Sequence, residues 1–188
     1  MSSTFTHKGH TFTVKHVHDS YHEPPWESGD GYGIVTDWIN YRADEAADYK
    51  DESKYRALNH DHGSVRYYDW QASLDKAREE QWGLTDADKA KLAARIGHEP
   101  TAEEVTAEAV RKDYEFLRGW CQDEWSYVGV VVALQGTDYE QSLWGIESNA
   151  DAYLAETARE LADAILDDAP AQIDADVARL QALRASLP

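Results

Sequence analysis

The chain has 188 residues, of which 36 are acidic and 18 are basic, so its formal net charge is -18. Hydrophobic residues make up 42%, with seven tryptophans and eleven tyrosines, which excludes a disordered chain and predicts a folded core. The carboxylate excess argues against direct binding to nucleic-acid phosphates or to an anionic membrane surface, because both depend on Lys and Arg.

The N-terminal part of the sequence predicts two short strands separated by an irregular segment. Residues 10–18 alternate between apolar and polar side chains, as a strand does, and residues 1–9 before them are expected to be flexible. Residues 19–33 contain two prolines and three glycines, which exclude regular structure. A short strand at 34–39 and a polar loop or exposed short helix at 41–54 follow.

The next segment predicts a hairpin that leads into a helix. Its strands are expected at 57–59 and 64–68, with the turn at 60–63. Asp69 stands where an N-cap residue would, ahead of a helix that runs to about Trp82.

Two more helices are predicted from their end signals. Thr85 is the N-cap of a helix over 86–96, which Gly97 ends. The run Thr101-Ala102-Glu103-Glu104 has the form of a capping box and opens a long helix that reaches about Cys121.

The last third predicts a second hairpin followed by two helices. The hairpin strands are 125–135 and 141–147. Asn149 caps the first helix, Pro170 is predicted to break it, and residues 173–187 form a final amphipathic helix.

Strands therefore occur early and late, around a helical middle. This order predicts an α+β fold, a mostly antiparallel sheet with helices packed on one side, in a single domain that spans 1–188. The oligomeric state stays open, with a homodimer as one alternative.

Several features predict a cytoplasmic protein. The single cysteine, Cys121, cannot form an internal disulfide, and its place beside Trp120 at a helix end is typical of packing rather than of a nucleophile. No signal peptide is expected at the N-terminus. The longest apolar run, 128–134, is far shorter than the roughly 18 residues of a membrane span.

The helix that begins after Asn149 has two contrasting faces. Its apolar face is formed by Leu154, Ala158, Leu161 and Ile165. Its opposite face carries Glu156, Glu160, Asp163 and Asp167. Arg159 is the only basic residue in the element, so these carboxylates have no cationic partner within the helix.

This acidic stripe has two interpretations. It is either a solvated helix face, or a surface that binds a basic partner protein. Successive phosphates lie about 7 Å apart along a nucleic-acid strand, a spacing that a row of carboxylates can imitate. A basic protein surface is therefore the predicted partner.

A cluster of histidines gives an alternative hypothesis, a metal site. His16 and His18 share one face of the predicted strand, and Asp19 and His22 follow closely. Imidazole and carboxylate groups in such proximity can bind a divalent metal. A second set occurs at 60–62, and surface histidines without any ligand are the simpler interpretation of both.

Four segments resemble blocks in small uncharacterised proteins of tailed bacteriophages and prophages. They are PWESGDGYGIVTDW at 25–38, GSVRYYD at 63–69, LRGWC at 117–121 and SLWGIES at 142–148. The resemblance covers about residues 18 to 167 and implies a phage accessory protein that acts in a bacterial cell. It carries no assigned activity, so no catalytic residue follows from it.

These observations lead to three functional hypotheses. The first is an acidic phage protein, without cofactor, that inhibits a host nucleic-acid-binding defence protein of the restriction or CRISPR type through Glu156, Glu160, Asp163 and Asp167. The second is a small enzyme that uses a divalent metal at His16, His18, Asp19 and His22. The third is a virion or assembly component.

Overall fold

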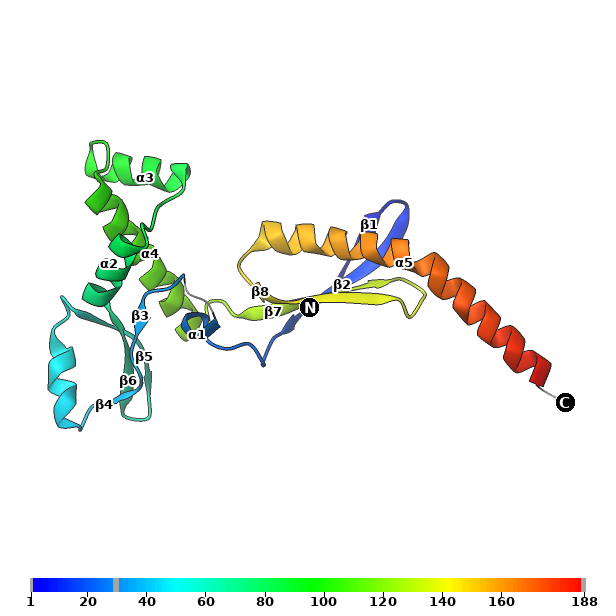
Figure 1. The fold of residues 1–188 in the computed structure, drawn as a ribbon, viewed down its shortest axis with the longest axis horizontal. Coiled ribbons are helices and arrows are strands. Elements are labelled where there is room, and N and C mark those ends of the chain that lie inside the picture. The colour runs from blue at the N-terminus through cyan, green and yellow to red at the C-terminus, as the bar shows by residue number, and fades with distance from the viewer. Residues whose placement is uncertain (1, 29–30, 187–188) are drawn as a thin grey trace. The chain divides into compact units, whose positions relative to one another are not determined.

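The structure is a computed structural model that describes residues 2–28 and 31–186 (Figure 1). Its contacts divide the chain into two compact units. The terminal unit consists of Met1–His22 with Trp125–Pro188, and the central unit of Glu23–Glu124. Both contain an antiparallel sheet with helices against it, so the predicted α+β class is confirmed. Among the described residues no helix is long and apolar enough to span a membrane.

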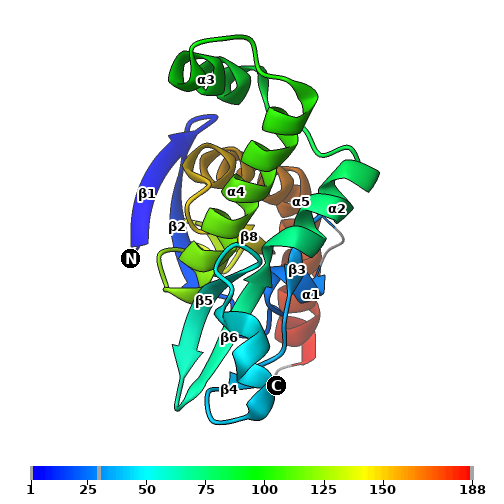
Figure 2. The ribbon, with the colours of Figure 1, turned by 90° about the vertical axis from the view of Figure 1, so that its left-hand side faces the viewer.

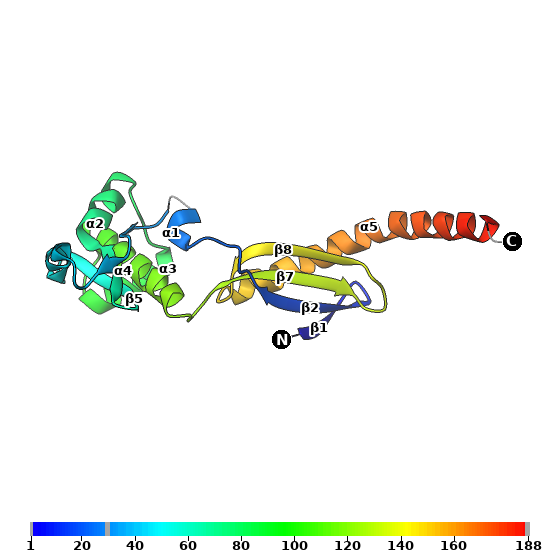
Figure 3. The same ribbon diagram turned by 90° about the horizontal axis from the view of Figure 1, so that it is seen from below.

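The terminal unit is a four-stranded antiparallel sheet with one long helix on it (Figure 3). The strand order is β1-β2-β7-β8. The elements are β1 (Ser2–His7), β2 (His10–His18), β7 (Tyr127–Leu134), β8 (Glu140–Glu147) and α5 (Asp151–Ser186).

Alternation in the strands and helical periodicity in α5 place the core between them. Phe12, Val130 and Val132 are fully buried and meet Leu154 and Ile165 of the helix. Burying such a side chain contributes roughly 1.5–3 kcal/mol, so this seam holds the helix to the sheet.

Residues 1–9 were expected to be flexible, yet Ser2–His7 form β1, which pairs with β2 along its length. Lys8 and Gly9 have φ values of 47° and 83°, as in a two-residue hairpin turn. The Phe5 ring stacks on that of Phe12 at 5.6 Å, which gives β1 an apolar contact with the core.

The predicted break at Pro170 is wrong, because α5 continues through it as one helix of 36 residues. A proline removes one backbone donor and costs about 3 kcal/mol, which kinks or breaks a helix. Alanine and leucine are frequent on both sides and favour the helical state. Figure 1 shows the helix bending and running on beyond the sheet.

The central unit is built around the β5–β6 hairpin, seen in Figure 2. β6 pairs with β5 over its whole length, while the two-residue strands β3 and β4 also pair with β6, so β5 has a free outer edge. The strands are β3 (Ile34–Val35), β4 (Ile39–Asn40), β5 (Tyr55–Asp61) and β6 (Ser64–Asp69). The predicted hairpin is therefore confirmed, whereas the strand predicted at 34–39 is split in two.

The helices of the central unit begin where their caps predict. Asp69, Thr85 and Thr101 each accept a backbone N–H of the first turn, and Thr101 with Glu104 completes the capping box. The helices are α1 (Pro25–Ser28), the 3₁₀ helix η1 (Asp44–Lys50), α2 (Trp70–Glu79), α3 (Asp86–Ile96) and α4 (Ala102–Cys121). The short α1 lies in the segment for which no regular structure was predicted.

A partly buried carboxylate joins three segments of the central unit. Asp113 of α4 accepts hydrogen bonds at one oxygen from the Gly33 N–H and the Tyr68 hydroxyl, each at 2.8 Å. Tyr68 is fully buried. A side chain at Gly33 would place its Cβ 2.2 Å from the Tyr68 hydroxyl oxygen, so the close approach requires glycine.

We expect Gly33→Ala to lower the free energy of unfolding by about 1–3 kcal/mol, because the buried Tyr68 ring has no room to move away. Gly83→Ala is the matched control, since a Cβ there meets nothing within 4 Å. Chemical denaturation of both variants measures the difference. Equal stability of the two variants would contradict the packing argument.

Candidate functional site

The structure places the predicted acidic stripe on the outer side of α5, and its apolar face against the sheet. Leu154 and Ile165 are buried, whereas Glu156, Glu160 and Asp167 are exposed. These three carboxylates have no ion-pair partner among the described side chains.

Asp163 differs from the other members of the stripe because the β1–β2 turn neutralises it. Its Oδ1 lies 2.8 Å from the Lys8 Nζ and 2.6 Å from the His7 Nε2. The hydrogen bond from Lys8 is the main reason that the pKa of Asp163 is lowered. The stripe therefore presents three free carboxylates rather than four.

The predicted metal-binding residues do not come together. His16 and His18 are exposed on β2, and the His22 ring packs edge-on against Tyr127 at 3.8 Å. The Asp19 carboxylate accepts the Tyr21 N–H. Among the side chains that the structure describes, no three His, Cys, Asp or Glu are grouped to hold a metal ion.

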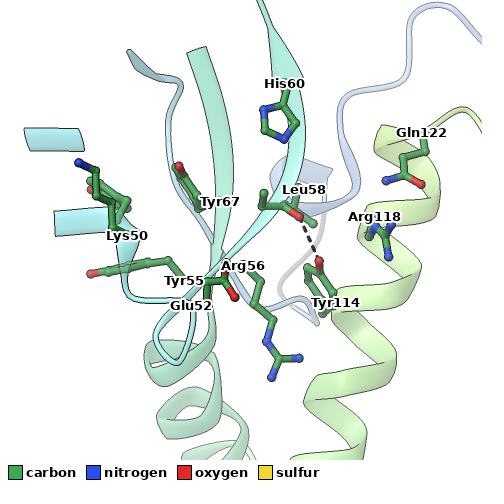
Figure 4. A pocket seen from close by; sticks show the side chains of 12 residues that line it. Lys50, Glu52, Tyr55, Arg56, Leu58, His60, Tyr67, Tyr114, Arg118 and Gln122 are labelled. Carbon is green, nitrogen blue, oxygen red and sulfur yellow. Dashed lines mark hydrogen bonds between the residues drawn. The ribbon is translucent and has the colours of Figure 1, made fainter. Parts of the chain in front are cut away.

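A cavity of about 810 Å³ lies beside the free edge of β5 (Figure 4). Its size is within the usual range for ligand pockets. The wall on one side comes from η1 and the start of β5, and the wall on the other side from α4. The lining residues are Tyr49, Lys50, Glu52, Tyr55, Arg56, Ala57, Leu58, His60, Tyr67, Tyr114, Arg118 and Gln122.

Local periodicity explains how α4 forms its wall. Tyr114, Arg118 and Gln122 follow one another at intervals of four residues, which places them on one face of the helix. The Tyr114 hydroxyl donates to the Ala57 carbonyl at 3.0 Å, the contact drawn as a dashed line in Figure 4. This bond ties α4 to β5 and so fixes the width of the cavity.

Three tyrosines form the opposite wall. The Tyr49 ring lies 4.6 Å from that of Tyr55 and stacks on that of Tyr67 at 5.4 Å. All three side chains are partly buried, and burial raises the pKa of Tyr67. We call Tyr49, Tyr55 and Tyr67 the tyrosine wall.

Three cationic side chains also line the cavity. Lys50, Arg56 and Arg118 have no carboxylate partner within 4.0 Å among the side chains that the structure describes. Elsewhere, seven cations form such pairs, namely Lys8, Lys76, Arg78, Lys91, Arg95, Arg111 and Lys112. Other described cations, such as Lys15, Arg42 and Lys89, do not. The only carboxylate of the lining is Glu52.

Arg56 is held in place by aromatic rings instead of a carboxylate. Its guanidinium lies 3.2 Å from the centre of the Trp70 ring and 5.7 Å from that of Tyr114. Such stacking is favourable and leaves the N–H groups at the guanidinium edge able to bind an anion. His60, at the other end of β5, is hydrogen-bonded to the Tyr41 hydroxyl.

Comparisons with family models, curated proteins and solved structures found no match to the chain. The resemblance to phage proteins thus stays a prediction, and the function has to be argued from the geometry alone. Sequence reasoning did not identify the cavity. Its one sequence signal was the spacing of Tyr114, Arg118 and Gln122, which does not by itself indicate a site.

Cys121 and Asp113 are two further groups with a shifted pKa that could take part in catalysis. Burial raises the pKa of the Cys121 thiol to about 11, which opposes a nucleophilic role. Burial also raises the pKa of Asp113 to about 6, against the effect of its two hydrogen-bond donors. Because these donors are Gly33 and Tyr68, we assign Asp113 to the fold.

Asp113 should make stability depend on pH. Its pKa of about 6 in the folded state exceeds the ordinary 3.8, so the folded state binds the proton more tightly. The contribution of this group to the free energy of unfolding is therefore largest below about pH 4. It falls by up to about 3 kcal/mol as the pH rises to about 6.

Asp113→Asn keeps an acceptor for Gly33 and Tyr68 and has no charge. We expect the variant to gain stability relative to the native chain between pH 4 and pH 6, as measured by denaturant titrations across that range. Using the difference between the two curves cancels the other titrating groups. Parallel curves would show that Asp113 does not titrate as described.

Proposed function

We propose that the central unit binds a small anionic ligand that contains a planar ring, in the cavity beside β5. The observation that carries this proposal is that Lys50, Arg56 and Arg118 line the same cavity as the tyrosine wall and have no carboxylate partner among the described side chains. These side chains place positive charge on one cavity of a chain whose net charge is -18, and a bound anion would neutralise it.

Electrostatic range favours a small ligand over a polyanion. At physiological ionic strength the Debye length is about 8 Å, so an anion inside the cavity interacts chiefly with the cations that line it. A long nucleic acid would extend over the surrounding surface, where the carboxylate excess repels phosphates.

The free edge of β5 is poorly suited to bind a peptide as an added strand, because some of its backbone groups already form hydrogen bonds. A peptide that extends a sheet needs the backbone groups of the edge strand. The Ala57 carbonyl is already taken by the Tyr114 hydroxyl, and the Tyr55 N–H by the Asp51 carbonyl. Recognition through the side chains of the cavity requires neither bond to break.

We expect Arg118→Gln to weaken the binding of phenyl phosphate, a ring-bearing anion, by about tenfold to a hundredfold. A hydrogen bond to a charged group contributes about 1.5–3 kcal/mol, and the exposed Arg118 has no described structural partner to lose. Isothermal titration calorimetry measures the affinity. Arg159→Gln, an exposed arginine of the terminal unit, is the control.

The proposal fails if the native protein binds no ring-bearing anion, phenyl phosphate included. It fails equally if Arg118→Gln binds as tightly as the control. The free energy of unfolding, measured for both variants, separates a change in binding from a change in folding.

A second candidate function is the inhibition of a basic, nucleic-acid-binding host protein by the outer face of α5. It is favoured by the exposure of Glu156, Glu160 and Asp167 without a described cationic partner. Such a row of carboxylates would compete with nucleic acid for a basic groove and would be guided to it by long-range attraction.

Replacing Glu156, Glu160 and Asp167 with lysine should abolish this inhibition, while Asp163 is kept because it pairs with Lys8. DNA cleavage by restriction endonucleases and by a Cas9 nuclease, with and without the protein, is the measurement. The control carries three lysines at exposed acidic positions elsewhere, namely Glu79, Glu99 and Glu124. No inhibition by the native protein, or equal inhibition by the two variants, contradicts this function.

A further inference from the structure

We infer that the ligand of the β5 cavity is a nucleoside phosphate, with its base on the tyrosine wall and its phosphate near Arg118 and Arg56. The inference rests on the proposed binding function and narrows its ligand class. It follows from how the two recognition chemistries are distributed in the cavity.

The planar and the anionic recognition elements lie on different sides of the cavity. Figure 4 shows Tyr55 and Tyr67 on the η1 side of β5, and Arg118 and Gln122 on α4 at the other side. A ligand that uses both must carry its ring and its anion apart, joined by a spacer. A nucleoside phosphate has this form, because the sugar separates the base from the phosphate.

The tyrosine wall suits a base better than an aliphatic group. Stacking between a base and an aromatic side chain contributes about 1–3 kcal/mol and accepts any base, because every base has a π-face. Lys50 lies on the same side of the cavity. A purely aliphatic anion would leave this wall unused.

The opposite side suits a phosphate. Arg118 is exposed on α4, and Arg56 presents a guanidinium whose face is already occupied by Trp70. Arginine binds phosphate through paired N–H groups, which makes the contact directional as well as charged. Gln122 on α4 and His60 on β5 add polar groups to the lining that can bond the sugar hydroxyls.

The rest of the surface argues for a mononucleotide rather than a strand. Single-stranded nucleic acid is held by a positively charged groove that follows several phosphates. Here Arg78 on α2, Arg95 on α3, and Arg111 and Lys112 on α4 are each paired with a carboxylate. One phosphate is therefore matched by the cavity, and a row of phosphates is not.

The test compares the affinity of whole nucleotides with that of ligands that represent only one part of a nucleotide. Affinities of the full-length protein for AMP, GMP, CMP, UMP, adenosine, inorganic phosphate and phenyl phosphate are measured by isothermal titration calorimetry. At least one nucleoside monophosphate should bind tenfold or more tightly than phenyl phosphate. Adenosine and inorganic phosphate should each bind weakly, because each engages one side of the cavity.

Substitutions at Tyr55 and Arg118 test which part of the nucleotide each side of the cavity binds. Tyr55→Leu should weaken binding of the best nucleotide at least fivefold and leave inorganic phosphate unchanged, whereas Tyr55→Phe should keep the nucleotide affinity. Arg118→Gln should weaken both ligands. Tyr21→Leu, at a tyrosine that is 96% exposed in the terminal unit, is the control.

The outcomes distinguish this inference from the function on which it rests. If phenyl phosphate binds but no nucleotide binds more tightly, the inference is overturned and the proposed function stands. If no anion binds, both are overturned. If a ten-nucleotide single strand binds at least a hundredfold more tightly than any mononucleotide, with a steep salt dependence, the ligand is a nucleic acid and the inference is overturned.

Discussion

Positive charge is scarce in this chain, with 18 basic against 36 acidic residues, so the position of each cation matters for both folding and binding. On α3 and α4, Arg95 and Arg111 share Glu108, and Lys112 bridges to Asp88. In the terminal unit, Lys8 holds the β1–β2 turn to Asp163. Exposed pairs of this kind contribute at most about 1 kcal/mol each, but they remove local repulsion where helices and turns approach.

The cations of the β5 cavity are used differently, because the fold holds them without carboxylates. Helix α4 makes this possible through two adjacent residues. Asp113 bonds Tyr68 of β6, and Tyr114 bonds Ala57 of β5, so the helix is fixed to both strands of the hairpin. One turn further along, Arg118 is then placed at the cavity by the rigidity of the helix rather than by a salt bridge.

Local signals in the sequence were sufficient for much of the fold. Caps such as Thr101, and turn residues such as Gly63, act within a few residues, so the elements they bound could be predicted. β1 could not, because its stability comes from pairing with β2 and from the stacking of Phe5 on Phe12. The sequence predicted that Pro170 breaks the helix, but the helix continues through it, because the effect of a proline depends on the helix-forming residues on both sides.

The candidate cavity was beyond sequence reasoning for a related reason. Its residues come from η1, from both strands of a hairpin and from α4, and only the fold brings them together. The composition indicated acidity, and the outer face of α5 bears this out except at Asp163, which Lys8 and His7 occupy. The net charge of the whole chain does not reveal that the charged residues lining the cavity beside β5 are mainly cations.

The opposite charge of the α5 face and the cavity has a physical consequence for how the two surfaces can act. The carboxylates of α5 are exposed, so their field extends into solvent until salt screens it, and it favours encounter with large basic partners. The cations of the cavity lie beside tyrosines and a free strand edge, and at physiological ionic strength they act mainly on an anion within about 8 Å of them. Because the two surfaces belong to different units and carry opposite charge, the two proposed functions are independent, and the ligand proposed for one surface would be repelled by the other.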